Sequence, residues 1–222
     1  MEHLLERFTA AVGAAGGSAP AADVEAAGMD VLRRWSEPHR GYHDVEHLTE
    51  VLRRLDELAD HGVPVPVEAY LGAWFHDAVH EGRAGDDERE SAELAARELA
   101  ALGVPDDVAR RVAAVVLVTA GHRVPPGDEA AAALCDADLA VLAADAERYA
   151  RYVDGVRREY PGVDDATFAA GRAAVLRDLL DRPALFSTAV GRERWEARAR
   201  RNVALELAAL DGPGTPVDNA GG

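Results

Sequence analysis

The chain of 222 residues is long enough for one sizeable hydrophobic core and short for two full domains. Its formal net charge is −16, and such an acidic surface disfavours non-specific binding to nucleic acid or to an anionic membrane. Every basic residue is Arg, which excludes Schiff-base chemistry and a phosphate-binding Walker lysine. An anionic small substrate remains compatible with this charge, because a bound divalent cation reverses the local field.

The cysteine content and the N-terminal segment indicate the compartment. The single cysteine, Cys135, cannot form an intramolecular disulfide, which suits a reducing compartment and excludes a zinc site built from cysteines. The first residues are too charged for a signal peptide, and no apolar run reaches the roughly 20 residues of a membrane span. We therefore expect a cytoplasmic protein that neither enters a membrane nor binds nucleic acid. A homo-oligomer is compatible with the sequence.

Apolar residues recur at helical spacing along most of the chain. The clearest stripe follows Tyr42, where Val45, Leu48, Val51 and Leu55 lie three or four residues apart. An interruption is expected near Cys135 in the long helical stretch after residue 128, and Thr188 is expected to cap, or nearly cap, the last helix. The expected helices cover 2–12, 23–35, about 42–60, 67–79, 87–102, 106–119, 128–160, 167–180 and 192–210.

No alternating strand pattern interrupts these helices. The Val-rich segment 112–118 has strand-like composition, but the charged helical pattern around it favours a helix. We therefore predict an all-α fold, with one helical domain over 1–210. The Gly/Pro-rich segment 211–222 is expected to be a disordered tail.

Histidine and aspartate residues gather on the helices that should be buried. His43 and His47 are four residues apart and are expected to share one helix face. His76 and Asp77 are adjacent on the apolar helix 67–79, where a buried carboxylate is costly unless it is paired or metal-bound. Asp136 and Asp138 are expected near a helix start that faces the core. Taken singly, each is most simply a hydrogen-bonded core residue; together they indicate a metal site.

The types of donor atom limit which metal ions the site can bind. Imidazole and carboxylate ligands suit Mn, Fe, Ni, Co, Zn or Mg, and no thiolate is offered. Two histidines and two aspartates leave coordination positions open for water and substrate, as in catalytic sites.

The order of these residues resembles a known family. His47, His76-Asp77 and Asp138 are similar to the H…HD…D pattern of the HD superfamily of metal-dependent phosphohydrolases, over about residues 30–180. Within it, the chain resembles a subfamily of predicted HD phosphohydrolases. The resemblance implies an HD-domain helical bundle that binds one or two divalent ions through these four residues. Asp77 would bridge two ions. His80 and His122 are the available additional ligands for a second ion, with His122 the better candidate, and a site with one ion is equally compatible.

The resemblance and the local chemistry also suggest residues around the metal. The arrangement from Tyr42 to His47 is similar to the metal site of cyclic-nucleotide phosphodiesterases, which implies that His43 donates a proton to the leaving oxygen. Arg40 could clamp a phosphate with its planar fork, or be an exposed loop arginine. Glu88 could orient a water or act as a base, or partner the N-terminal dipole of its own helix. Glu159 could lie at a pocket wall or make a structural ion pair, and the ion pair is the favoured interpretation.

These observations predict a metal-dependent phosphohydrolase that acts on a phosphomonoester or phosphodiester, with a nucleotide as the expected small substrate, through a metal-activated water. Two alternatives stay open. One is an HD-fold oxygenase with a di-iron centre; the other is a non-catalytic module that binds metal or nucleotide.

Overall fold

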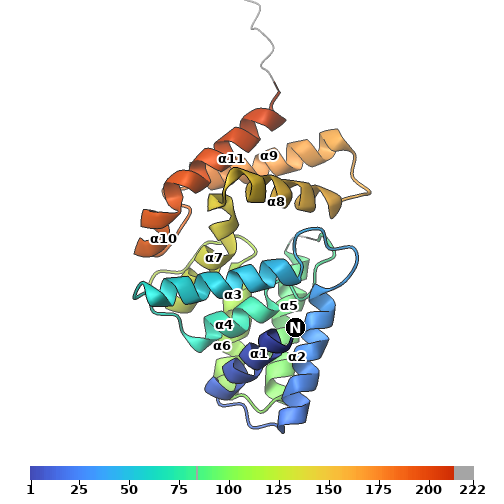
Figure 1. The fold of residues 1–222 in the computed structure, drawn as a ribbon, viewed down its shortest axis with the longest axis vertical. Helices are drawn as coiled ribbons and strands as arrows, with labels where there is room; N and C mark the ends of the chain where they lie inside the picture. The colour runs from blue at the N-terminus through green and yellow to red at the C-terminus, as the bar shows by residue number, and fades with distance from the viewer. Residues whose placement is uncertain (84, 213–222) are drawn as a thin grey trace, which may run out of the picture.

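A computed structural model describes residues 1–83 and 85–212 of the chain (Figure 1). These residues form helices and no strand, which confirms the predicted all-α fold. Among them, no helix combines the length and the apolar character needed to cross a membrane. From residue 213 onward the predicted tail lies outside the described residues, and the single domain over 1–210 stays a prediction.

The elements are α1 Glu2–Ala14, α2 Ala21–Trp35, α3 Val45–Asp60, α4 Val67–Phe75, α5 Asp86–Ala101, α6 Asp106–Val118, α7 Glu129–Leu139, the 3₁₀ helix η1 Ala140–Ala143, α8 Ala146–Arg158, α9 Asp165–Asp181, α10 Ala189–Arg194 and α11 Glu196–Leu210.

Two helix boundaries at the predicted site differ from the expectation. Helix α3 begins at Val45 because the Asp44 carboxylate accepts hydrogen bonds from the N–H groups of the first turn, which makes Asp44 its N-cap. His43 therefore precedes the helix, and the prediction that it shares a helix face with His47 is wrong. Helix α4 ends at Phe75, so the His76-Asp77 pair lies just beyond the helix and not within it.

Later boundaries differ as well. The stretch 128–160 is interrupted after Leu139 and not near Cys135, since the chain tightens into η1 before Asp145 caps α8. Asp138 accordingly lies in the last turn of α7 and not at a helix start. Thr188 caps the short α10, which is separate from α11, so it does not cap the last helix.

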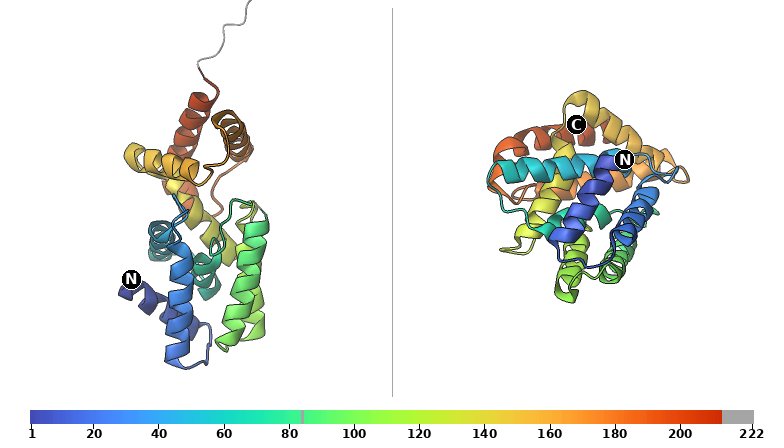
Figure 2. Two further views of the ribbon diagram at one scale, coloured as in Figure 1. Left: turned by 90° about the vertical axis from the view of Figure 1, so that its right-hand side faces the viewer. Right: turned by 60° about the horizontal axis from the view of Figure 1, so that its bottom comes forward.

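Figures 1 and 2 show two groups of helices that are joined by α7 and η1. In Figure 1, α1, α2, α4, α5 and α6 form the lower part, α3 crosses above them, and α8 to α11 form the upper part. Helix α4 contacts α1, α3, α5, α6 and α7, as expected for a helix that is apolar on all sides. Helices α8 and α11 pack against η1.

The packing of α4 on α7 brings the two halves of the predicted site together. Gly72 permits this close approach, because a Cβ atom at that position would lie 2.9 Å from Cδ2 of Leu134 and 3.3 Å from Cγ1 of Val115. Trp74 and Phe75, which follow on α4, are fully buried. The chain after α4 is therefore held directly against the last turn of α7.

Candidate metal centre

Four side chains from three segments converge in the core. The Nε2 atoms of His47 and His76 lie 3.3 Å apart. Oδ1 of Asp138 lies 3.0 Å from Nε2 of His47 and 3.7 Å from that of His76. Oδ2 of Asp77 lies 3.2 Å from Nε2 of His76 and 3.7 Å from that of His47. The structure thus brings together all four residues that the sequence singled out as metal ligands.

Main-chain contacts orient this group. Nδ1 of His76 lies 2.9 Å from the carbonyl oxygen of Ala73 in the last turn of α4, so Nδ1–H donates and Nε2 presents its lone pair to the other three residues. His47 is the third residue of α3, and its own N–H donates to the Asp44 cap. Both imidazole rings are almost fully buried, whereas both carboxylates keep a small exposed fraction. The site is therefore anchored inside the core and open on the carboxylate side.

His122 also reaches the centre. Its Nε2 lies 2.8 Å from Oδ2 of Asp138, the oxygen that does not face the two buried histidines. The backbone of His122 has φ = 50°, a left-handed conformation that costs a non-glycine residue roughly 1–2 kcal/mol. Its N–H bonds to the carbonyl of Val118 and so closes the C-terminus of α6. A strained backbone whose side chain contacts the group is typical of a functional position.

The electrostatics of the group favour a cation. Burial raises the pKa of the Asp138 carboxyl, but hydrogen bonds from His122, His47 and His76 outweigh it and hold that pKa well below its ordinary value. The pKa of Asp77 is likewise lowered, against burial, by His76 and His43. Both carboxylates are thus ionised at neutral pH. Two imidazole nitrogens and two carboxylates at these separations form a donor set that suits a borderline divalent ion, which would replace the protons.

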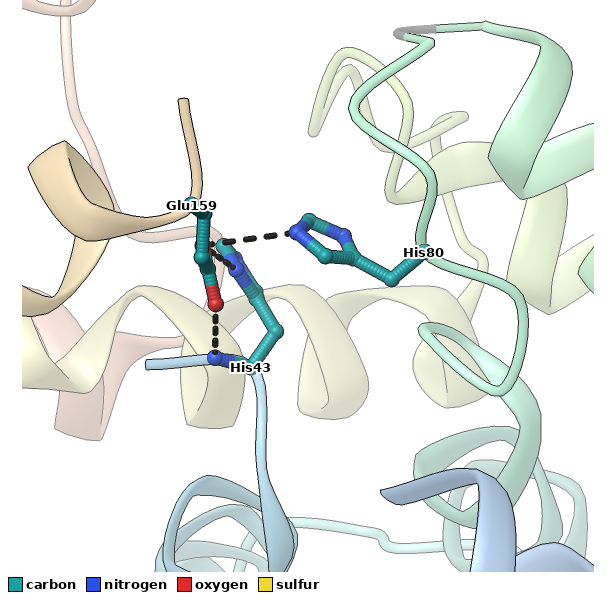
Figure 3. A group of neighbouring side chains, drawn as sticks. All are labelled: His43, His80 and Glu159. Carbon is teal, nitrogen blue, oxygen red and sulfur yellow. Dashed lines mark hydrogen bonds and ion pairs between the residues drawn. The ribbon is translucent and has the colours of Figure 1, made fainter. Parts of the chain in front are cut away.

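Figure 3 shows a second group, formed by His43, His80 and Glu159. Its His43 ring lies near the first group, with its centroid 5.6 Å from that of the His47 ring. Oε1 of Glu159 accepts hydrogen bonds from three successive N–H groups, those of residues 41, 42 and 43, at 2.9, 2.8 and 2.8 Å. Its Oε2 lies 2.7 Å from Nδ1 of His43 and 3.3 Å from Nε2 of His80. The Glu159 side chain is only 2% exposed. The sequence allowed Glu159 at a pocket wall or in a structural ion pair and favoured the latter, but it did not indicate the contact with His43.

This second group also has the composition of a metal site, with three ligand atoms within 4.8 Å of one another. The 2.7 Å separation between His43 and Glu159 is a hydrogen-bond length, however, and Glu159 already accepts three N–H bonds on its other oxygen. We therefore interpret it as a carboxylate–imidazole pair. Because Nδ1 of His43 faces Glu159, its Nε2 is left for other partners. Burial lowers the pKa of His43, but Asp77 and Glu159 outweigh burial and raise it.

Arg40 does not have the geometry of a phosphate clamp. Its buried guanidinium donates to the carbonyl oxygens of His43 and Asp77, both at 2.8 Å, and to that of Ala78 at 3.3 Å. Its remaining N–H groups donate to the Glu37 carboxylate. All five donors of the group are thereby used. Arg40 is therefore a positioning residue that ties the loop before α3 to the turn after α4.

Glu88 is engaged at the start of its own helix. Its carboxylate accepts a hydrogen bond of 2.6 Å from the N–H of Gly85, the N-cap of α5. This contact fits the helix-terminus role that the sequence allowed as the alternative to a catalytic base. Within residues 1–83 and 85–212, Glu88 makes no hydrogen bond or ion pair with the four central residues.

Comparison with known proteins adds no further assignment. No family model matches the chain, and neither the curated proteins nor the solved structures include a match. The resemblance to the HD superfamily therefore stays a prediction that depends on the residues of this chain.

Proposed function

We propose that this protein is a metal-dependent phosphohydrolase that acts on a phosphomonoester or phosphodiester. The observation that carries the proposal is the convergence of two buried imidazole Nε2 atoms, 3.3 Å apart, with the carboxylates of Asp77 and Asp138. A nucleotide is the substrate class that the family resemblance suggests. A divalent ion held by these four residues would supply Lewis acidity and lower the pKa of a bound water to near 7.

Residues around the four ligands would donate a proton to the leaving oxygen and hold the centre in place. Glu159 holds the His43 ring through Nδ1 and leaves Nε2 as the nitrogen that can give a proton to a leaving oxygen. Asp77 and Glu159 raise the pKa of His43 above its ordinary value, against burial, which favours the protonated ring that this role needs. Arg40 holds the main chain on both sides of the centre, and His122 orients Asp138 or binds a second ion.

The test is a double variant with a matched control. His76→Ala with Asp77→Ala should lose the metal, by elemental analysis of the purified protein, and should lose hydrolysis in a screen of nucleotides and phosphate esters. His3→Ala, whose side chain is 81% exposed, should keep both. A melting curve verifies that the double variant is folded. Hydrolysis that persists in the folded double variant would refute the proposal.

The same measurements separate the two alternatives. A di-iron oxygenase would contain iron and change its absorbance on reduction, with His122 contributing to the second ion. A non-catalytic module would bind nucleotide tightly with several divalent metals and release no product. The cytoplasmic location, the absence of nucleic-acid binding and a homo-oligomer stay predictions beside this function.

A further inference from the structure

The group of His43, His80 and Glu159 contains a buried nitrogen that the carboxylate–imidazole pair does not use (Figure 3). Nε2 of His80 is closed to solvent and has no hydrogen-bond partner within residues 1–83 and 85–212. It lies 3.3 Å from Oε2 of Glu159 without making a hydrogen bond to it. The His80 side chain as a whole is 11% exposed. A buried polar nitrogen without a partner is destabilising, and a bound ion is one way in which it is satisfied.

The Glu159 carboxylate is held with one oxygen toward both rings. Its Oε1 accepts three N–H groups of the loop before α3, so Oε2 is the oxygen that faces His43 at 2.7 Å and His80 at 3.3 Å. Hydrogen bonds of this kind commonly orient a carboxylate that binds a metal. They fix Glu159 equally well whether Oε2 meets a proton, as in the ion-free chain, or an ion.

The turn after α4 is fixed against the end of α8, which places His80 opposite this oxygen. The carbonyl oxygen of His80 accepts a hydrogen bond of 2.8 Å from Nε2 of His39. The ring of His80 lies over that of His43, with centroids 4.2 Å apart and an angle of 34° between the planes. Gly82 packs against Tyr160, since a Cβ atom at Gly82 would lie 3.3 Å from Cε1 of that ring. The two rings and the carboxylate are therefore held together by contacts outside the group itself.

The ligand atoms have a spacing close to that of a small divalent ion. One nitrogen of each ring and one carboxylate oxygen lie within 4.8 Å of one another. Zinc bonds of about 2.0–2.2 Å in a tetrahedron place ligand atoms about 3.3 Å apart. The separation between His80 and Glu159 meets this value, and that between His43 and Glu159 must open by about 0.6 Å when an ion replaces the proton. The His43 side chain is 24% exposed, so it is not packed on every side and its ring can turn by this amount.

A cavity of about 530 Å³ adjoins the group, and its lining includes both His80 and Glu159. An ion can approach the ligand atoms from this side, and water from the cavity can take the fourth coordination position. Arg40 also lines the cavity, but its guanidinium is occupied by carbonyl oxygens and by Glu37. The group shares no residue with the four ligands of the candidate metal centre.

Two imidazole nitrogens and one carboxylate oxygen, with one position open, form a donor set that suits Zn²⁺. We propose that His43, His80 and Glu159 form a second metal site, which binds Zn²⁺ in place of the proton between His43 and Glu159. The site itself does not depend on the proposed function, but its consequence does. An ion on Nδ1 prevents His43 from becoming an imidazolium, so zinc at this site would inhibit proton donation to a leaving oxygen.

The test measures the zinc content of the full chain, by dialysis of the ion-free protein against micromolar Zn²⁺ and elemental analysis. His80→Ala removes one ligand of the second site and should retain one Zn²⁺ ion per chain fewer than the unaltered chain. His61→Ala is the matched control, because it removes an exposed histidine outside both groups, and it should bind as much zinc as the unaltered chain. A melting curve verifies that both variants are folded.

Equal zinc content in folded His80→Ala and the unaltered chain would overturn the second site. If His80→Ala does not fold, NMR of the unaltered chain labelled with ¹⁵N-histidine carries the test. Saturating Zn²⁺ should move the signals of Nδ1 in His43 and Nε2 in His80 to the positions of metal-bound nitrogens, and an unchanged Nε2 signal of His80 overturns the site too.

The two proposals fail separately. Loss of one ion in His80→Ala, with no ester hydrolysed by the unaltered chain, would support the second site and refute the phosphohydrolase. Hydrolysis by the unaltered chain, with a zinc content that does not depend on His80, would overturn the second site alone.

Discussion

Replacing Glu159 tests the contact between α8 and the loop before α3 most directly. Glu159→Ala removes the acceptor of three main-chain N–H groups and the partner of the His43 ring. Each buried N–H left without an acceptor costs about 1 kcal/mol or more, and the charged pair adds about 1.5 kcal/mol, so the free energy of unfolding should fall by about 4 kcal/mol. Glu159→Gln keeps an oxygen acceptor for the loop and should lose only about 1.5 kcal/mol.

The assay is urea unfolding of the ion-free protein at pH 7, followed by circular dichroism. Glu147→Ala is the matched control on the same helix, since this side chain is 87% exposed, and it should change the free energy of unfolding by less than about 0.5 kcal/mol. A loss below about 1 kcal/mol in Glu159→Ala would refute the reasoning, because water would then replace the carboxylate at little cost.

The pH dependence gives an independent measurement. Burial raises the pKa of Glu159, but the neighbouring His43 and His80 rings outweigh it and hold this pKa far below its ordinary value. A depressed folded-state pKa means that the stabilisation is fully present above the unfolded pKa of about 4.3 and is lost as the pH falls below it. The difference between the unaltered chain and Glu159→Gln should therefore shrink below about pH 4. If the difference in the free energy of unfolding did not change below about pH 4, Glu159 would not be the charged partner of His43.

Three further predictions follow from the packing and the charges. Gly72→Ala should destabilise the fold by about 1–3 kcal/mol and weaken metal binding, because the added Cβ would lie 2.9 Å from Leu134; Gly13→Ala, with nothing within 4 Å, should be neutral or stabilising in the same thermal melts. Arg40→Lys should lower the free energy of unfolding by about 2–3 kcal/mol in urea, since three carbonyl oxygens lose their donors, and a change within error would argue against the positioning role. Apparent metal affinity should rise with pH, because burial lowers the pKa of His76 but Asp77 and Asp138 raise it further, so binding displaces a proton; a pH-independent affinity in competition titrations would contradict this.

The elements of the fold could be predicted from the sequence because their causes are local. Apolar spacing predicted the helices, and the Val-rich segment is helical in α6, as expected. The boundaries at the site were predicted less well. Asp44 caps α3 because its carboxylate accepts hydrogen bonds from the N–H groups two and three positions later. The sequence around Asp44 is equally compatible with a helix that begins at Tyr42, so it did not determine this boundary.

The four central residues could be predicted as a group because their order resembles the HD pattern and because buried polar residues need partners. The roles of Arg40 and Glu159 could not. Both contact main-chain carbonyl and N–H groups, which every residue type offers, so no side-chain pattern reveals them.

The sequence by itself therefore determined the helices, their apolar faces and the identities of the residues that must meet in the core. Only the tertiary structure decided how they meet: the packing of α4 on α7 places His76 and Asp77 against Asp138, and the end of α8 places Glu159 against His43. The physical reason is the range of the interactions. Helix formation and capping act over a few residues, whereas the geometry of the site depends on contacts between segments far apart in the chain.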